Sequence, residues 1–304
     1  MSTPELLEPA PYPPAGPTEP LGRPILGPRA LGDSWSRFWH LSYNIARSEF
    51  KLKFFGSALG YLWQVVRPLM LFGVLYVFFV LVFHVDKAKG AAAHHYGAQL
   101  LGSIVLFTCF GEGSSGAVRS VVDRENLVRK IQFPRLAIPI SVVLLALFNL
   151  ALNVVVVMVF AVIEGVRPMV SWLELPLIIL MLTVLTTGVA MLLSALFVRF
   201  RDIAPIWEVF SQILFYSAPV ILPAETVRAE LGQGSLLYHI YTLNPLVAIF
   251  QQFRHAMINH STFSAGQVMG SWLYLLEPLA LVVVLIIVGF WVFNREASHI
   301  AEDL

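Results

Sequence analysis

Two acidic residues stand inside segments that are otherwise apolar, and they are the first candidates for chemistry. Glu112 lies in the run 98–118, and Glu208 lies in the run 203–222. An ionisable side chain is expensive in hydrocarbon, so within a membrane span it is usually paired or functional. If the second run is a helix, Glu208 shares one face with a set of polar and aromatic neighbours, namely Ser211, Gln212 and Phe215. This stripe could line a hydrated pathway, or it could hydrogen-bond to a neighbouring helix, because both roles require the same geometry.

Asn149 and Asn153 are four residues apart in a run of Val and Leu. Their uniformly apolar surroundings favour hydrogen bonds between helices over a pathway. Small side chains also recur in the run 98–118, at Gly111, Gly113, Ser115 and Ala117. Small residues allow close approach of a second helix, which could belong to the same chain or to a second copy.

Other kinds of chemistry find little support in the sequence. His94 and His95 are adjacent, with His84 nearby, and adjacent side chains point apart. A metal site needs three or four convergent ligands, so a solvated loop is the favoured interpretation. Cys109 is the only cysteine and lies in an apolar run, which favours a buried apolar role. No phosphate-binding G-x-x-x-x-G-K-[ST] motif occurs, and no nucleophile–base pair stands out. We therefore expect no catalytic residue, metal or cofactor in this chain.

The composition predicts an α-helical membrane protein. Of 304 residues, 57% are hydrophobic and 13% are charged, against roughly 25% charged in a soluble domain. The net charge of +1 gives no basic surface for nucleic acid. A membrane-spanning helix needs roughly 20 apolar residues. Six segments qualify: 61–85, 98–118, 136–163, 175–198, 203–222 and 272–293.

The distribution of Lys and Arg predicts the orientation. With the N-terminus in the cytoplasm, inner segments hold 15 of the 20 basic residues and outer segments hold five. Basic residues concentrate in cytoplasmic loops. Both termini are therefore expected in the cytoplasm, with an even number of spans.

Two segments precede the first span. Residues 1–32 are proline-rich and lack an apolar core, which predicts a disordered cytoplasmic tail. Residues 33–56 form an amphipathic helix with an aromatic face, and Glu49 and Lys53 do not fit its division into faces. Such a helix is expected to lie in the membrane interface, although packing on a soluble domain would need the same pattern. Residues 57–304 would then form the membrane domain.

The outer segment 236–258 is apolar but interrupted. The residue before a proline is disfavoured in helices, so Asn244-Pro245 predicts two short helices instead of a span. Asn244 can cap the second helix and Pro245 can begin it. Arg254 falls on that helix, where it could meet a lipid phosphate or a glycan anion. The two helices could dip into the outer leaflet as a gate, or form an ordinary extracellular hairpin.

Four motifs together resemble the transmembrane subunit of type-2 ABC exporters, in the polysaccharide branch that includes O-antigen, teichoic-acid and galactan exporters. They are Ser57-Ala58-Leu59-Gly60-Tyr61-Leu62-Trp63 with Pro68, the loop 126–135, Arg201-Asp202-Ile203 with Ser217-Ala218-Pro219-Val220, and Asn244-Pro245 with Arg254. The resemblance covers about residues 35–295.

The resemblance implies a homodimer that works with two copies of a separate ATPase subunit, which would bind ATP and Mg. The cargo would be a polyprenyl-pyrophosphate-linked polysaccharide. The residues expected to contact the ATPase are Asp123, Arg124, Glu125, Asn126, Arg129, Lys130, Arg201 and Asp202. The substrate pathway would use Phe54, Phe55, Tyr61, Trp63, Glu208, Gln212, Phe215 and Tyr216. The outer gate would contain Asn244, Pro245 and Arg254.

Several of these assignments have alternatives. The aromatic side chains could stack on sugar rings, but Tyr61 and Trp63 could equally anchor the chain at the membrane surface. A type-2 ABC permease for drugs or free lipids would share the fold. An ion-coupled carrier would need inverted repeats or more buried charges, neither of which is evident. A membrane-embedded enzyme would need an acid–base constellation that the sequence lacks.

Overall fold

The computed structural model describes residues 34–54, 60–84, 95–125, 134–232, 234–257 and 262–296, and within these ranges the chain is helical with no strand. Four long helices are α3 (Tyr96–Ser120), α5 (Ala137–Ile163), α6 (Leu175–Arg199) and α12 (Leu276–Glu296). The helix α2 (Gly60–Tyr76) continues into the π-helix η1 (Val77–Val82). These five segments are long and apolar enough to cross a membrane.

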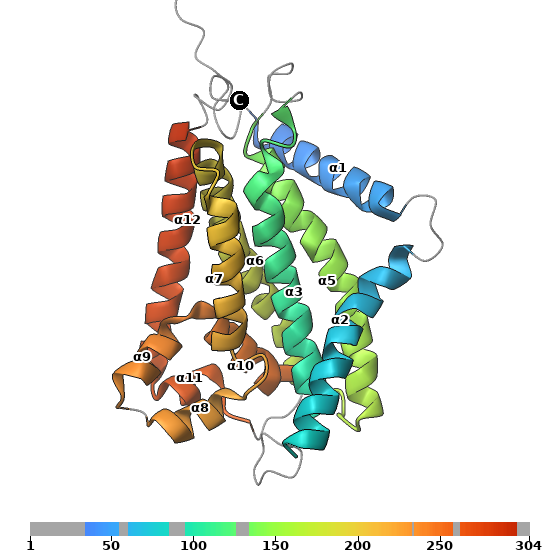
Figure 1. Ribbon diagram of the computed structural model, residues 1–304, viewed down its shortest axis with the longest axis vertical. Helices are drawn as coiled ribbons and strands as arrows, with labels where there is room; N and C mark the ends of the chain where they lie inside the picture. The colour runs from blue at the N-terminus through green and yellow to red at the C-terminus, as the bar shows by residue number, and fades with distance from the viewer. Residues whose placement is uncertain are drawn as a thin grey trace, which may run out of the picture.

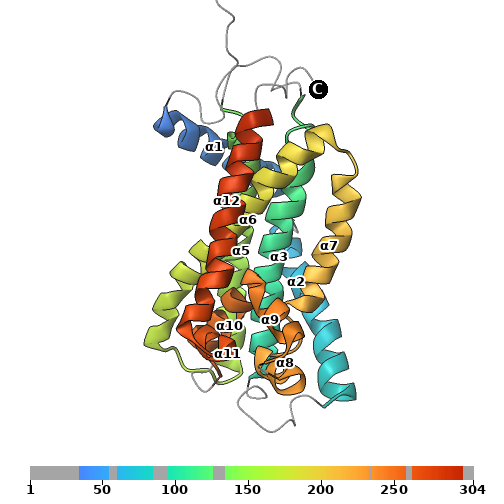
Figure 2. The same cartoon turned by 90° about the vertical axis from the view of Figure 1, so that its left-hand side faces the viewer.

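The chain passes back and forth between the two ends of one bundle (Figures 1 and 2). The helix α1 (Trp35–Phe54) and the C-terminal end of α12 lie at the same end, which we call the inner end. The inner end also carries the turn after α3 and the turn between α6 and α7 (Ile203–Ser217). Segments that the sequence assigns to the cytoplasm therefore share one end of the molecule.

The helix α7 is shorter than the predicted span 203–222. It has 15 residues and a length of about 22 Å, against roughly 30 Å of hydrocarbon. It ends at Ser217 because Pro219 forces Ala218 into an extended conformation, with φ −84° and ψ 157°. The predicted boundary at Leu222 is therefore wrong, although α7 still runs from the inner end toward the outer helices (Figure 2).

Short helices gather at the other end, which we call the outer end. They are α8 (Ala224–Leu231), α9 (Leu236–Leu243), α10 (Pro245–Met257) and α11 (Ala265–Met269), with the 3-10 helices η4 (Val170–Glu174) and η5 (Trp272–Leu275). The sequence predicted only α9 and α10. Serine caps mark two of the other starts: Ser264 forms a capping box with Gln267 at α11, and Ser271 accepts from the Leu273 backbone nitrogen at η5.

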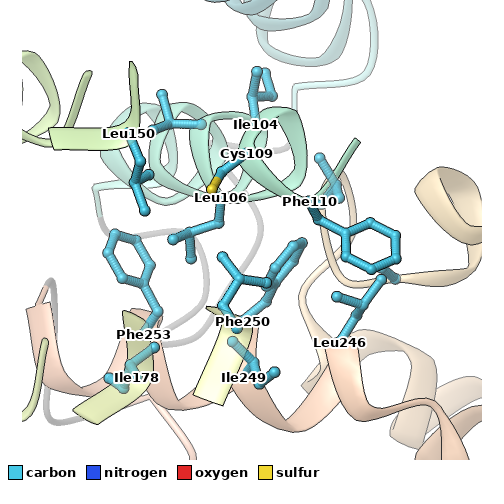
Figure 3. Packing of buried hydrophobic residues seen from close by; sticks show 14 of the residues in the cluster. Ile104, Leu106, Cys109, Phe110, Leu150, Ile178, Leu246, Ile249, Phe250 and Phe253 are labelled. Atoms are coloured by element: carbon cyan, nitrogen blue, oxygen red, sulfur yellow. The ribbon is translucent and has the colours of Figure 1, made fainter. Parts of the chain in front are cut away.

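The helix α10 is part of the hydrophobic core and not a peripheral lid. Leu246, Phe250 and Phe253 are 0–2% exposed. Figure 3 shows them pointing toward Leu106 and Phe110 of α3. The C-terminal carbonyls of α10 accept hydrogen bonds from η4, so this end is also covered by protein.

Small residues set two close helix crossings. A Cβ atom on Gly289 of α12 would lie 2.5 Å from the Gly188 oxygen of α6. A Cβ atom on Gly113 of α3 would lie 2.5 Å from Thr186 Cγ2 of α6. The close approach predicted from the small residues of α3 thus occurs, at Gly113, with a helix of the same chain.

The helix α1 divides its apolar side between two environments. Phe38 and Ala46 are both buried, and Phe38 belongs to the hydrophobic cluster that includes Phe293 of α12. Trp35, Trp39 and Tyr43 remain 42–63% exposed. Exposed aromatic rings of this kind are typical of membrane-interface anchors, so the pattern agrees with the interfacial prediction without testing it.

Candidate functional site

The turn after α3 carries the first group of residues predicted to contact an ATPase. Asp123 is exposed, and Arg124 forms an ion pair with Glu49 of α1. This pair explains why Glu49 does not fit the amphipathic pattern of α1. Burial lowers the pKa of Arg124 from its ordinary value, but an arginine side chain remains charged at neutral pH. Asn126, Arg129 and Lys130 lie outside the described residues.

Glu125 follows this turn and is half-buried. The second predicted contact, Arg201 with Asp202, is exposed on the turn between α6 and α7. The guanidinium of Arg201 lies 5.3 Å from the centre of the Phe197 ring, and that of Arg119 on α3 lies 5.9 Å from it. The structure therefore places the α6–α7 turn beside the end of α3, so the two predicted contact regions are neighbours.

Glu112 is paired within the chain. Its Oε1 accepts a hydrogen bond from Gln64 Nε2 of α2 at 3.1 Å, and its Oε2 accepts one from Asn149 Nδ2 of α5 at 2.6 Å. Lys53 Nζ of α1 donates to Gln64 Oε1 at 3.2 Å. One chain of polar side chains thus connects α1, α2, α3 and α5.

This chain of hydrogen bonds bears on two sequence predictions and includes one residue, Gln64, that was not predicted. Asn149 does bridge helices, as predicted. Asn153 does not, because its side chain donates to the Asn149 backbone oxygen of its own helix at 2.9 Å. Gln64 was missed, although a polar residue near the start of an apolar span was the available signal.

The predicted aromatic pathway is only partly described. Phe55 lies outside the described residues, as do the side chains of Phe54 and Tyr61. Trp63, on the first turn of α2, is 57% exposed. Its exposure is compatible with sugar contact and with membrane anchoring.

On α7, Glu208 and Gln212 of the predicted stripe are exposed, whereas Phe215 of the same stripe packs on α3. The contact with α3 is made by Trp207, whose Nε1 donates to Ser115 Oγ at 3.2 Å, and by Phe215, whose ring centre lies 5.0 Å from that of Phe107. Glu208 and Gln212 are exposed and have no hydrogen-bond partner in the described part of the chain. Tyr216 is 75% exposed. Hydrogen bonding within this bundle therefore does not account for the stripe.

The predicted break at Asn244-Pro245 is present. The helix α9 ends at Leu243, and α10 begins at Pro245. Asn244 is extended, with ψ 115°, and its Oδ1 accepts from the Leu246 backbone nitrogen at 3.0 Å. Asn244 caps α10 and Pro245 takes its first position, as the sequence predicts.

The prediction that Arg254 meets a lipid phosphate or a glycan anion is wrong for this structure. Arg254 is 1% exposed. Its Nε donates to Ser103 Oγ of α3 at 3.3 Å, and its Nη2 donates to the Val220 oxygen at 3.0 Å. The sequence placed Arg254 on an outer helix but could not show that this face of α10 points into the bundle. Tyr96 Oη supports the same turn by donating to the Ile221 oxygen at 3.2 Å.

Comparisons with known proteins agree with this architecture. A family model described as ABC-2 type transporter matches residues 42–258. An O-antigen export system permease protein RfbA of Klebsiella pneumoniae is 25% identical over 261 residues, which cover 86% of this chain and 93% of the relative. A protein of the same description from Myxococcus xanthus is 25% identical over 268 residues, covering 87% and 95%.

Proposed function

Because the chain belongs to the ABC-2 type transporter family, we propose that it is the membrane subunit of an ATP-driven exporter that moves a polyprenyl-pyrophosphate-linked polysaccharide across the bacterial cytoplasmic membrane. The observation that carries this proposal is the match to permeases named for O-antigen export, which extends over nearly the full length of those relatives. The five long apolar helices support a multi-pass membrane subunit.

The arrangement of the bundle supports six membrane crossings with both termini in the cytoplasm. The described chain begins and ends at the inner end, which favours an even number of passes, and we propose α7 as the sixth. The helix α7 is shorter than the hydrocarbon core. The bilayer would therefore have to become thinner around it, or another subunit would have to cover its ends.

Two copies of the chain are proposed to form the pathway between them. Glu208 and Gln212 stand exposed on α7 in the single chain. An ionisable side chain facing lipid is costly, so a second copy or a hydrated passage is the favourable environment for this face. Exposed apolar side chains on α7, such as Phe210 and Ile213, would pack against that copy or against lipid.

Energy is proposed to come from two copies of a separate ATPase subunit docked at the inner end. Asp123, Arg201 and Asp202 are exposed there on adjacent turns. Charged groups on exposed turns suit docking to a charged partner. The chain itself is proposed to bind neither ATP nor Mg and to act as a permease without catalytic activity.

The test is purification followed by reconstitution. We expect the chain to co-purify with an ATPase subunit and, when purified alone, to hydrolyse no ATP. Proteoliposomes that contain both subunits should move a lipid-linked glycan in an ATP-dependent manner, and a free phospholipid or a drug should not replace it. ATP hydrolysis by the isolated chain would contradict the division of labour, and transport of drugs or free lipids alone would favour the other branch of the family.

A further inference from the structure

A polar cavity of about 600 Å³ opens at the inner end between α1, α2, α3 and α5. This volume lies within the range of about 300–1,000 Å³ that is usual for small-molecule sites. Most of its polar lining is ionisable, and the six ionisable residues are Glu49, Lys53, Arg67, Glu112, Asp123 and Arg124. Its position differs from that of the exposed stripe on α7 and of the buried Arg254.

The charges of the cavity are balanced, with three acidic and three basic side chains. Glu49 and Arg124 already form an ion pair, so a simple anion would still meet the carboxylates of Glu112 and Asp123, and a simple cation would still meet Lys53 and Arg67. A ligand with one positive and one negative group can place each group beside side chains of the opposite charge. The lining thus favours a zwitterion over either kind of ion.

Two polar atoms of the lining remain unsatisfied within the described residues. They are Asn149 Oδ1, an acceptor, and Arg124 Nη1, a donor. Asn149 is 3% exposed, so solvent has little access to it. A buried polar atom without a partner costs about 1–3 kcal/mol, which a ligand of complementary hydrogen-bonding groups would recover. The ligand must therefore donate near Asn149 and accept near Arg124.

The cavity lies at the expected depth of lipid headgroups. The apolar span of α2 begins at Leu62, and Gln64, which bonds to Glu112, is in its first turn. Figure 1 shows α2 beginning beside the C-terminal end of α1, well short of the inner end of α3. If the membrane surface passes through the start of α2, the cavity faces the headgroup layer of the inner leaflet.

From these observations, we propose that the cavity binds the headgroup of a zwitterionic phospholipid with a primary ammonium, of the phosphoethanolamine type. The ammonium donates to Glu112 and Asn149, and the phosphate accepts from Arg67 and Arg124. A lipid bound in this way would hold α2 against α3 and α5 at the point where the polar chain of side chains joins them. The proposal depends on the membrane position of the chain and not on the cargo that it exports.

The experiment uses the full chain reconstituted in bilayers with equal parts of phosphatidylethanolamine, phosphatidylcholine and phosphatidylglycerol that share the same acyl chains. After extraction, the lipids that remain on the protein are quantified by mass spectrometry. Phosphatidylcholine has the same charges as phosphatidylethanolamine but no N–H donor, so it is the decisive comparison. We expect phosphatidylethanolamine to be retained roughly tenfold over phosphatidylcholine, which corresponds to about 1.4 kcal/mol.

Variants then assign the retained lipid to the cavity. Glu112→Gln and Arg67→Gln should reduce this preference to near unity. Glu230→Gln is the control, because it makes the same chemical change at an exposed position of α8 at the outer end, outside the cavity. An unchanged elution profile shows that each variant is folded, and the exposed Arg67 is the safer of the two positions.

Three outcomes would overturn the proposal. Equal retention of phosphatidylethanolamine and phosphatidylcholine would show that the ammonium is not recognised. Retention of no lipid would show that water fills the cavity. Displacement of bound phosphatidylethanolamine by an added polyprenyl phosphate would assign the cavity to the lipid carrier of the cargo and leave the proposed function intact.

Discussion

Arg254 has the largest fully buried side chain among the described residues, and its hydrogen bonds explain how the protein tolerates it. It joins Ser103 of α3 to the Val220 carbonyl in the turn after α7. Glu112 plays a similar part at the inner end, where it joins Gln64 and Asn149. At the residue scale, the buried guanidinium of Arg254 and the half-buried carboxylate of Glu112 both serve contacts between helices, since each one links segments far apart in the sequence.

Replacing Arg254 should weaken the outer end. In Arg254→Leu, the Val220 carbonyl loses its donor, and a buried unsatisfied group costs about 1–3 kcal/mol, whereas the Ser103 hydroxyl keeps its hydrogen bond to the Gln99 oxygen. We expect a lower midpoint of thermal unfolding in detergent, with partial recovery in Arg254→Lys. Arg228→Leu is the control, because Arg228 makes an exposed hydrogen bond to the Gln267 carbonyl. An unchanged midpoint in Arg254→Leu would refute the structural role.

At the element scale, close crossings and abrupt ends determine where the helices lie. The crossing of α6 and α12 depends on Gly188 and Gly289, and the separation of α9 from α10 depends on Asn244-Pro245. Each feature comes from a residue type with restricted chemistry: glycine lacks a Cβ atom, and proline lacks a backbone donor. Substitutions at these positions therefore act on whole helices.

Gly289→Ala should separate α12 from α6. The new Cβ atom would lie 2.5 Å from the Gly188 oxygen, which belongs to the backbone and cannot turn aside. Overpacking of this kind costs about 1–3 kcal/mol, so the unfolding midpoint should fall. Gly111→Ala is the matched control, because its Cβ atom would meet nothing within 4 Å and alanine favours helix. If both variants unfold alike, the crossing does not have the stated role.

Joining α9 to α10 should block export. Asn244→Leu with Pro245→Ala removes the cap and restores the backbone donor, so the two helices can merge into one. A merged helix would shift the buried face of α10 out of register with α3. We expect loss of glycan export in cells or proteoliposomes, with unchanged ATP binding by the partner subunit. Leu236→Ala on exposed α9 is the control, and full export by the double variant would favour a simple outer hairpin.

At the scale of the whole molecule, two exposed surfaces of the described residues suit partners outside the single chain. One is the exposed polar and apolar face of α7, and the other is the charged inner end. The first suits a second copy or a pathway, and the second suits an ATPase. Both assignments depend on the proposed function, and each has its own test.

Labelling of cysteine variants can test the α7 face. In a Cys109→Ala background, cysteines at positions 208 and 212 should react with a small polar reagent in the assembled transporter. Position 215 should react less than these, because Phe215 packs on Phe107. A cysteine at position 287 on α12, where Ile287 is 61% exposed, is the control for a face toward lipid. If 208 and 212 react no faster than 287, they do not line a hydrated passage.

Charge reversal can test the inner end. Asp123→Lys with Glu125→Lys should leave membrane insertion intact, because both residues follow the end of α3. We expect export to fall while the ATPase subunit keeps its own hydrolytic activity, since the contact that transmits the motion is disturbed. Glu230→Lys on α8 is the control at the outer end. Normal export with normal assembly in the double variant would remove the claim.

The sequence by itself determined the class of protein, the positions of the long helices and the break at Asn244-Pro245. These features follow from local properties, namely the length of apolar runs and the restricted backbone of proline. The end of α7 at Ser217 was equally local, because the signal was Pro219, but the apolar run up to Leu222 concealed it. The family motifs were likewise readable in the sequence, and the comparisons confirm the family.

Only the tertiary structure decided which polar residues meet. Lys53, Gln64, Glu112 and Asn149 lie on four helices, and no periodicity in one helix can reveal a partner on another. The burial of Arg254 was hidden for the same reason, because an amphipathic pattern shows that α10 has two faces but not which one enters the bundle. Helix packing makes that choice, since it alone brings Ser103 and the Val220 carbonyl within reach of one guanidinium.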